Sequence, residues 1–127
     1  MEVRDAVEAD AEGLAELTGS PEDVMRNLVH DRTVRIGETD EEMEGFVSYD
    51  AQAGTVHVTQ LEGDIEDCVR LLEEPIRFAD AEGMAVELLV PEDDETAREA
   101  AERSGFERTG AGPRFDGRET VRYRYGD

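Results

Sequence analysis

Histidine and cysteine are the side chains that most often move protons or attack carbonyl carbons near neutral pH. This sequence has two histidines and one cysteine. His57 stands in a predicted strand, where it is either a general base able to deprotonate an ammonium group or a partly exposed strand residue. His30 lies near the end of a predicted helix, where the helix dipole favours a cation. Cys68 falls on the apolar side of another predicted helix, which indicates a small core residue.

Other kinds of site would leave patterns that the sequence lacks. His30, His57 and Cys68 are too widely spaced for zinc ligands, so we assign no metal site. The sequence contains no calcium-loop pattern, no Ser-His-Asp arrangement and no Walker phosphate-binding loop. A single cysteine also excludes an internal disulfide.

A glycine stands directly before the helix with the clearest pattern, within the stretch 60–65, Gln-Leu-Glu-Gly-Asp-Ile. Glycine lets backbone N–H groups approach a pyrophosphate, and a helix N-terminus adds partial positive charge. The same helix end is crowded by four carboxylates, those of Glu62, Asp64, Glu66 and Asp67. These would repel a diphosphate unless salt or bound cations intervene. We interpret Asp64 and Asp67 as helix-capping residues in preference to ligands.

Hydrophobic spacing predicts the elements that would carry these residues. Strands are expected at 2–6, 33–38, 43–49, 55–61, 84–90, from 106 onward and at 118–125, and helices after 10, after 20, at 64–82 and at 94–104. Asp10 and Ser20 are expected to cap the first two helices. Val24 and Leu28, with Met25 as a further candidate, are expected to face inward in the second. A turn is predicted at Asp116 and Gly117 before the last strand.

The predicted order is β-α-α-β-β-β-α-β-α-β-β, without a linker, repeat or low-complexity segment, so we expect a single domain over residues 1–127. Strands that alternate with helices around a nearly apolar strand at 84–90 indicate an α/β (α+β) fold with a mixed sheet covered on both faces. A smaller sensor domain with a ferredoxin-like core is an alternative. A V-shaped gap between strands 55–61 and 84–90 would exclude that alternative, whereas a fully paired sheet would favour it.

Particular residues in this order resemble the GCN5-related N-acetyltransferase (GNAT) superfamily. Asp94, Ala97 and the pair Gly105-Phe106 are similar to the family's pattern of Asn, Ala, Tyr and Gly-Phe along its last long helix. Glu2-Val3-Arg4 followed by Glu8-Ala9-Asp10 resembles its opening strand and helix. The resemblance implies an acyl-CoA N-acyltransferase-like fold. Two positions depart from the pattern: Asp94 replaces the Asn, and Ala101 replaces the Tyr that often protonates the departing thiolate.

The resemblance implies acetyl-CoA as co-substrate and an amine, on a small molecule or a protein, as acceptor. It places the pantetheine arm at the backbone of Val58, Thr59 and Gln60, and the pyrophosphate at Gly63, Asp64 and Ile65. His57 would lie where the family often has a base. The family's cofactor signature is Gln or Arg, Gly three residues later, and Gly or Ala two after that; here Gln60 and Gly63 match, but Ile65 takes the last place. Because this signature is incomplete and the tyrosine is replaced, the alternative is a non-catalytic module of this fold that binds a ligand or a protein.

The composition indicates the solvent conditions to which the protein is adapted and the kinds of partner that it can bind. The formal net charge is −21, from 34 acidic and 13 basic residues, and all the basic residues are arginine. With 38% hydrophobic residues at regular spacings, this charge indicates a salt-adapted acidic surface in preference to disorder. It argues against nucleic-acid binding, which needs clustered cations. We expect no membrane span, a cytoplasmic location and possible homodimers through edge strands.

Overall fold

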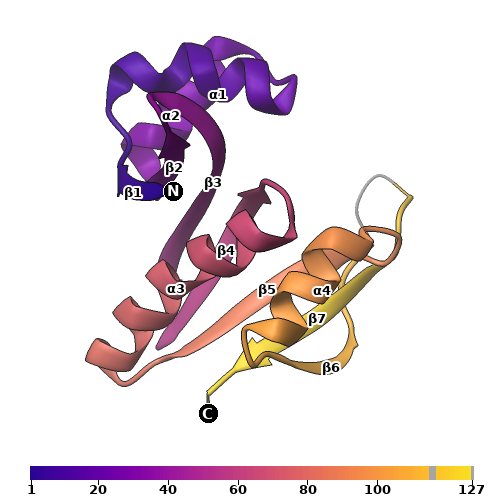
Figure 1. Ribbon diagram of the computed structural model, residues 1–127. Coiled ribbons are helices and arrows are strands. Elements are labelled where there is room, and N and C mark those ends of the chain that lie inside the picture. Colours follow the sequence, from indigo (N-terminus) through magenta and orange to yellow (C-terminus); the bar gives the residue numbers. More distant parts are fainter. Residues whose placement is uncertain (115–116, 127) are drawn as a thin grey trace.

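The computed structural model describes residues 1–114 and 117–126, and within them seven strands form one sheet in the order β1-β2-β3-β4-β5-β7-β6 (Figure 1). The elements are β1 (Glu2–Asp5), a short 3-10 helix (Glu8–Asp10), α1 (Ala11–Thr18), α2 (Glu22–Asp31), β2 (Thr33–Thr39), β3 (Glu42–Gln52), β4 (Thr55–Glu62), α3 (Ile65–Glu82), β5 (Ala85–Pro91), α4 (Glu95–Arg103), β6 (Glu107–Ala111) and β7 (Thr120–Tyr125). The order confirms the predicted succession of strands and helices. Among the described residues, no helix has the length and hydropathy of a membrane span.

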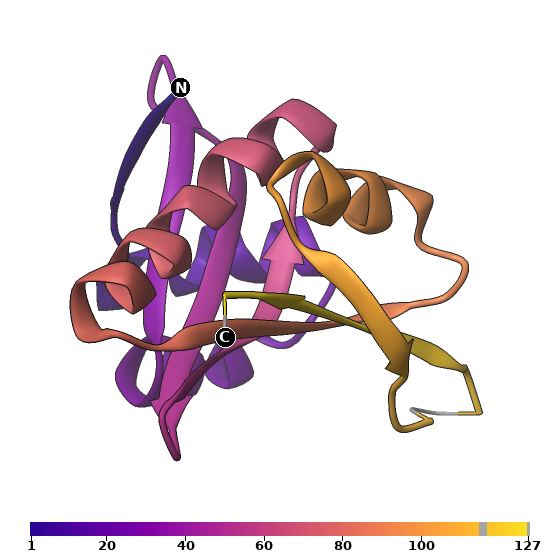
Figure 2. The same cartoon turned by 90° about the horizontal axis from the view of Figure 1, so that it is seen from below.

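Alternation along the strands sends side chains into two separate cores. Val34 and Ile36 of β2 pack with α1 and α2, whereas Val47 and Tyr49 of β3 belong to a larger core under α3 and α4. Between the first pair, Arg35 points to the other face and forms an ion pair with Glu74 of α3. Figure 2 shows α3 and α4 lying along one face of the sheet. The helices α1 and α2 therefore cover the opposite face of its N-terminal half.

The centre of the sheet is partly open because two neighbouring strands separate. β4 and β5 are parallel, and their pairing runs from Thr55↔Ala85 to Val58↔Leu88 and stops there. Both strands continue, β4 to Glu62 and β5 to Pro91. This is the V-shaped gap that distinguishes an acyltransferase-like sheet from a closed ferredoxin-like one.

A bulge in β4 coincides with the point of separation. Tyr49 of β3 pairs with Val58, but the preceding Ser48 pairs with Gln60, so Thr59 is an extra residue in the ladder. A β-bulge bends its strand and increases the local twist. The bulge therefore directs the end of β4 away from β5. The Ser48 and Thr59 hydroxyl oxygens lie 2.7 Å apart in a hydrogen bond, which holds the bulged residue against β3.

Local details of the first two helices differ from the sequence predictions. The residue at the N-cap of α2 is Pro21, not Ser20, and its side chain makes no capping bond. Of the residues expected to face inward in α2, Met25 is 1% exposed and Leu28 packs against the same core, but Val24 is 47% exposed, so the prediction for Val24 was wrong. The Asp10 carboxylate accepts from the Val7 N–H and from Arg4 and does not cap α1. The predicted turn at 116–117 begins outside the described residues.

Candidate functional site

The separation of β4 and β5 opens a groove of about 990 Å³, here called the β4–β5 groove. Its walls are residues 58–62 of β4 and 88–91 of β5. Asp93, Asp94 and Ala97 close it at the start of α4, and Thr18 and Ser20 lie at its other mouth, between α1 and α2. The groove therefore passes through the sheet from one face to the other.

A smaller cavity of about 470 Å³ adjoins this groove. It is lined by His57, Val58, Thr59, Glu87, Leu89, Pro91, Arg118 and Thr120. Glu87 and Leu89 alternate along β5 with Val86, Leu88 and Val90, which are buried under α3 and α4. The smaller cavity therefore lies on the opposite face of the sheet. The two hollows meet at Val58, Thr59, Leu89, Pro91 and Arg118, which line both.

The sequence predictions divide into two groups in space. Val58, Thr59 and Gln60, which the resemblance assigns to the pantetheine arm, all line the β4–β5 groove. Val58 is 7% exposed and is the last β4 residue paired with β5. Beyond it, β4 has backbone polar groups on the β5 side that no strand partner occupies. His57 lines the smaller cavity instead, beside Glu87, its register partner on β5.

The other group of predicted residues, Gly63, Asp64 and Ile65, forms the entry to α3 and does not line either hollow. Gly63 has φ +139°, a conformation that L-residues rarely adopt, so glycine is needed there. The Asp64 carboxylate accepts a hydrogen bond of 2.9 Å from the Asp67 N–H. The capping interpretation of Asp64 is confirmed, and this bond already uses one of the free N–H groups of the helix end.

Carboxylates give the start of α3 a negative potential. Burial, and then the neighbouring Asp94, raise the pKa of Glu62. Burial, and then the charge of Asp64, raise the pKa of Asp67. Burial, helped by the same carboxylates, raises the pKa of the Cys68 thiol to about 12. A helix N-terminus normally lowers the pKa of a nearby thiol, so burial, together with the carboxylates, outweighs the helix dipole here. Cys68 is a protonated, buried residue.

No tyrosine lines the groove within the described part of the chain. Ala101 is fully buried and offers no hydroxyl at the position where the resemblance expects one. Tyr49 packs under α3 against Phe78, with ring centroids 6.2 Å apart. The Tyr123 hydroxyl donates to Glu102 at 2.8 Å. The described residues therefore supply no phenol to protonate a thiolate in the groove.

Sequence reasoning missed two charged residues of the smaller cavity, Glu87 and Arg118. The Glu87 carboxylate is 18% exposed and lies 3.7 Å from the Arg122 guanidinium and 3.3 Å from that of Arg124. The sequence signal for Glu87 was that it is the single acidic residue in the apolar run 84–90. Alternation along the strand places its side chain on the face of the sheet away from α3. Arg118 stands in the stretch 108–124, where arginines are concentrated, but that pattern alone does not place it in a cavity. Among the described residues, no group of His, Cys, Asp or Glu side chains could hold a metal ion.

Solved structures share this architecture over nearly the whole chain. A ribosomal-protein-alanine N-acetyltransferase from Brucella melitensis aligns with a TM-score of 0.81 over 100% of both chains, at 14% identity. A Salmonella typhimurium protein described as an acetyltransferase, with its cofactor acetyl-CoA, aligns with a TM-score of 0.81 over 99% of this chain and 93% of its own, at 15% identity. A protein assigned to the GNAT family from Desulfovibrio desulfuricans aligns at 0.75 over 98% of both chains, at 21% identity.

No protein-family model and no curated protein matches the sequence. The structural likeness is extensive, but it occurs at low sequence identity. The chain has the acyl-CoA N-acyltransferase-like fold of the GNAT superfamily.

Proposed function

We propose that this chain is a GNAT acetyltransferase that transfers an acetyl group from acetyl-CoA to an amine. One observation carries the proposal: pairing between β4 and β5 stops at Val58↔Leu88 while both strands continue, and a groove of about 990 Å³ opens there. Ligands of open sheets bind where neighbouring strands separate, because backbone groups are unpaired and a crevice forms. The Salmonella typhimurium neighbour, solved with acetyl-CoA, has the same fold.

The thioester arm of acetyl-CoA fits the groove. Its amide groups can pair with the free backbone edge of β4 at residues 58–60, in the manner of an added strand. Val58, Leu88 and Val90 supply apolar surface for the methylene groups. The bulged Thr59 lies where the groove meets the smaller cavity, so the acetyl group at the end of the arm would face that cavity.

The nucleotide end of acetyl-CoA meets a less favourable environment. The resemblance places its diphosphate at Gly63, Asp64 and Ile65, at the start of α3. Asp64 already caps the helix, and Glu62 and Asp67 add negative charge there. Diphosphate binding at this position therefore depends on screening by salt, which agrees with the composition of an acidic, salt-adapted protein.

In the transfer step the neutral amine attacks the thioester carbonyl, the carbon–sulfur bond breaks, and the amine loses a proton. His57 lines the smaller cavity on the side from which the amine would enter, so it is the candidate acceptor of that proton, directly or through water. Because no tyrosine among the described residues lines the groove, the departing thiolate takes its proton from solvent. A stable thiolate needs no acid catalyst to leave, so this absence slows transfer without preventing it.

A second candidate function is a non-catalytic binding module of the same fold. The buried Ala101, in place of a hydroxyl, and the carboxylates at the start of α3 favour it. The two candidates differ in turnover: a module would bind a ligand in the groove without releasing coenzyme A in the presence of any amine.

The test is calorimetric titration of acetyl-CoA into the protein in molar potassium chloride. We expect micromolar binding to the wild type and at least tenfold weaker binding to Ala97→Leu, because Ala97 lines the groove. Ala81→Leu, an exposed change on α3, is the matched control and should bind as the wild type. Both variants must melt cooperatively near the wild-type temperature. An absence of binding at millimolar acetyl-CoA would refute the proposal.

A further inference from the structure

The smaller cavity has a carboxylate, that of Glu87, at one end, a guanidinium, that of Arg118, at the other, and an apolar floor between them. Glu87 lies at one end beside His57. Leu89 and Pro91 follow along β5 on the same face. Thr120 is the register partner of Pro91, and Arg118 lies beyond it at the other end. Four residues of strand span roughly 13 Å, and the two long side chains extend into the cavity and shorten that separation.

The Glu87 end is suited to an amine in its reactive, neutral form. The carboxylate is held by Arg122 and Arg124, but ionised carboxylates offer about four acceptor positions, so it can still accept from an amine. The two guanidinium groups beside it disfavour an additional positive charge. An amine bound at Glu87 is therefore oriented by the carboxylate and kept from remaining an ammonium ion.

The Arg118 end is suited to an anion. Asp93 accepts from Arg118 Nη2 at 2.5 Å, which fixes the guanidinium and leaves other N–H groups to donate. Its planar fork matches a carboxylate. The surrounding sequence is also exceptional for this chain: residues 108–124 hold five of the 13 arginines and two acidic residues, in a protein of net charge −21. A ligand anion is repelled less here than over the rest of the molecule.

We propose that the acceptor is an amine whose aliphatic chain ends in a carboxylate, with the amine at Glu87 and the carboxylate at Arg118. The inference rests on the proposed acetyltransferase function and names its acceptor class. The methylene groups lie on Leu89 and Pro91, and the amine reaches the thioester beside Thr59. A diamine of the same length would place a second positive charge against Arg118. The cavity therefore selects against polyamines, although the acidic surface attracts them.

The experiment compares acceptors of equal length by the release of coenzyme A thiol in molar potassium chloride. One set is γ-aminobutyrate, butylamine and putrescine; the other is δ-aminovalerate, pentylamine and cadaverine. We expect kcat/KM for the better amino acid to exceed that of its matched alkylamine about tenfold, as a charge-assisted contact provides. The matched diamine should be the poorest acceptor of its set.

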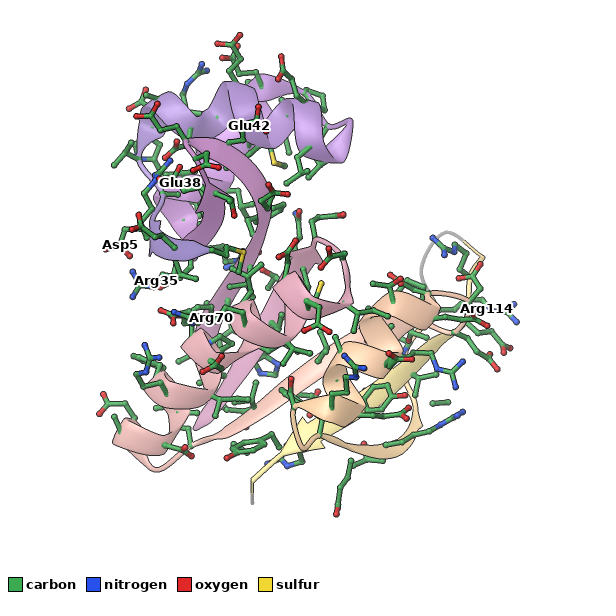
Figure 3. The ribbon with its side chains drawn as sticks, in the orientation of Figure 1. Asp5, Arg35, Glu38, Glu42, Arg70 and Arg114 are labelled. Carbon is green, nitrogen blue, oxygen red and sulfur yellow. The ribbon has the colours of Figure 1, made fainter. Side chains whose placement is uncertain are left out.

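Variants assign the discrimination to one side chain. Arg118→Gln should lower kcat/KM for the amino acid about tenfold more than kcat/KM for the matched alkylamine, so that the preference between the two acceptors is lost. Arg114→Gln is the control, because Arg114 pairs with Glu119 at 3.2 Å and does not line the cavity. Figure 3 shows Arg114 on the side of the molecule formed by α4 and β7, far from Asp5 and Arg35. It should behave as the wild type with every acceptor.

A binding experiment without acetyl-CoA separates this inference from the proposed function. The amino acid alone is titrated into the protein, and binding is monitored through the amide NMR signals of Glu87 and Thr120. Shifts at these residues that disappear in Arg118→Gln support the acceptor class even without turnover. Preference for diamines or alkylamines, or equal loss of both acceptors in Arg118→Gln, would overturn it. Acetyl-CoA binding without any shift from an amino acid would also overturn it. Failure of acetyl-CoA to bind counts against the proposed function alone.

Discussion

The carboxylates at the start of α3 lead us to predict an unusual salt dependence of acetyl-CoA binding. Most phosphate sites are cationic and lose affinity as salt rises. Here Glu62, Asp64 and Asp67 surround the position that the resemblance gives to the diphosphate, and the pKa values of Glu62 and Asp67 are raised. Acetyl-CoA should therefore bind more tightly as potassium chloride rises, because screening removes a repulsion.

The size of the effect follows from Coulomb's law. At about 7 Å, each carboxylate repels a diphosphate charge of about −2 by about 1.2 kcal/mol in unscreened water. Debye lengths of about 10 Å at about 0.1 M salt and about 3 Å at about 1 M reduce this to about 0.6 and about 0.1 kcal/mol. Over three carboxylates the difference is about 1.5 kcal/mol, roughly a tenfold decrease in Kd.

The assay is isothermal titration over this range of salt, limited to conditions in which circular dichroism shows a folded protein. S-acetylpantetheine, which has the same arm without phosphates, is the matched control, and its Kd should change little. A Kd for acetyl-CoA that rises with salt would refute the reasoning, because it would mean that arginines hold the phosphates. Parallel tightening of both thioesters would instead indicate that salt acts on the fold.

Three further predictions test other parts of the structure. Because the pKa of Glu62 is raised, acetyl-CoA should bind more tightly as pH falls below neutral, and Glu62→Gln should weaken this dependence in titrations. Arg4 holds the pKa of Asp10 below its usual range, so the stability from Asp10 is present at neutral pH and lost as pH falls. Asp10→Asn should therefore lower the free energy of unfolding, measured by urea denaturation, by about 1–2 kcal/mol at neutral pH. In acid the variant and the wild type should unfold with the same free energy. A Cβ on Gly45 would collide with the Glu62 carbonyl oxygen, whereas one on Gly37 meets only the movable Met1 side chain. Gly45→Ala should therefore lower the free energy of unfolding by about 2–3 kcal/mol, and Gly37→Ala should lower it by less than about 1 kcal/mol.

The succession of elements could be predicted because each has a strong local pattern. Apolar residues of α3 recur at helical spacing, and Val34 and Ile36 alternate as a strand requires. Helix capping at Asp64 was also predictable, because it depends on a side chain and a backbone N–H three residues apart. Such features need no knowledge of the rest of the fold.

Other features depend on which of several possible partners or faces the folded chain selects. Asp10 was expected to cap α1, but Arg4 and the Val7 N–H engage its carboxylate instead. Met25 and Val24 are adjacent, so a rotation of one position in α2 exchanges which of them is buried. The bulge at Thr59 follows from pairing with β3, and the sequence of β4 alone has no signal for it.

Some residues of the candidate site could also be predicted from the sequence, and others could not. Val58, Thr59 and Gln60 were placed through the resemblance and line the groove together. Glu87 was overlooked because the strand was interpreted as a run covered on both faces, whereas its outer face is open beyond α1 and α2. Arg118 reaches the cavity from the segment just before β7, so its position depends on the register of β5 with β7.

The most direct test of the account is to locate bound acetyl-CoA by amide NMR shifts of the isotope-labelled protein in molar potassium chloride. We predict that the largest shifts occur at residues 59–61 of β4 and 88–90 of β5, where the two strands separate. Saturating acetyl-CoA that leaves these amides unchanged, or shifts only residues elsewhere, would contradict it.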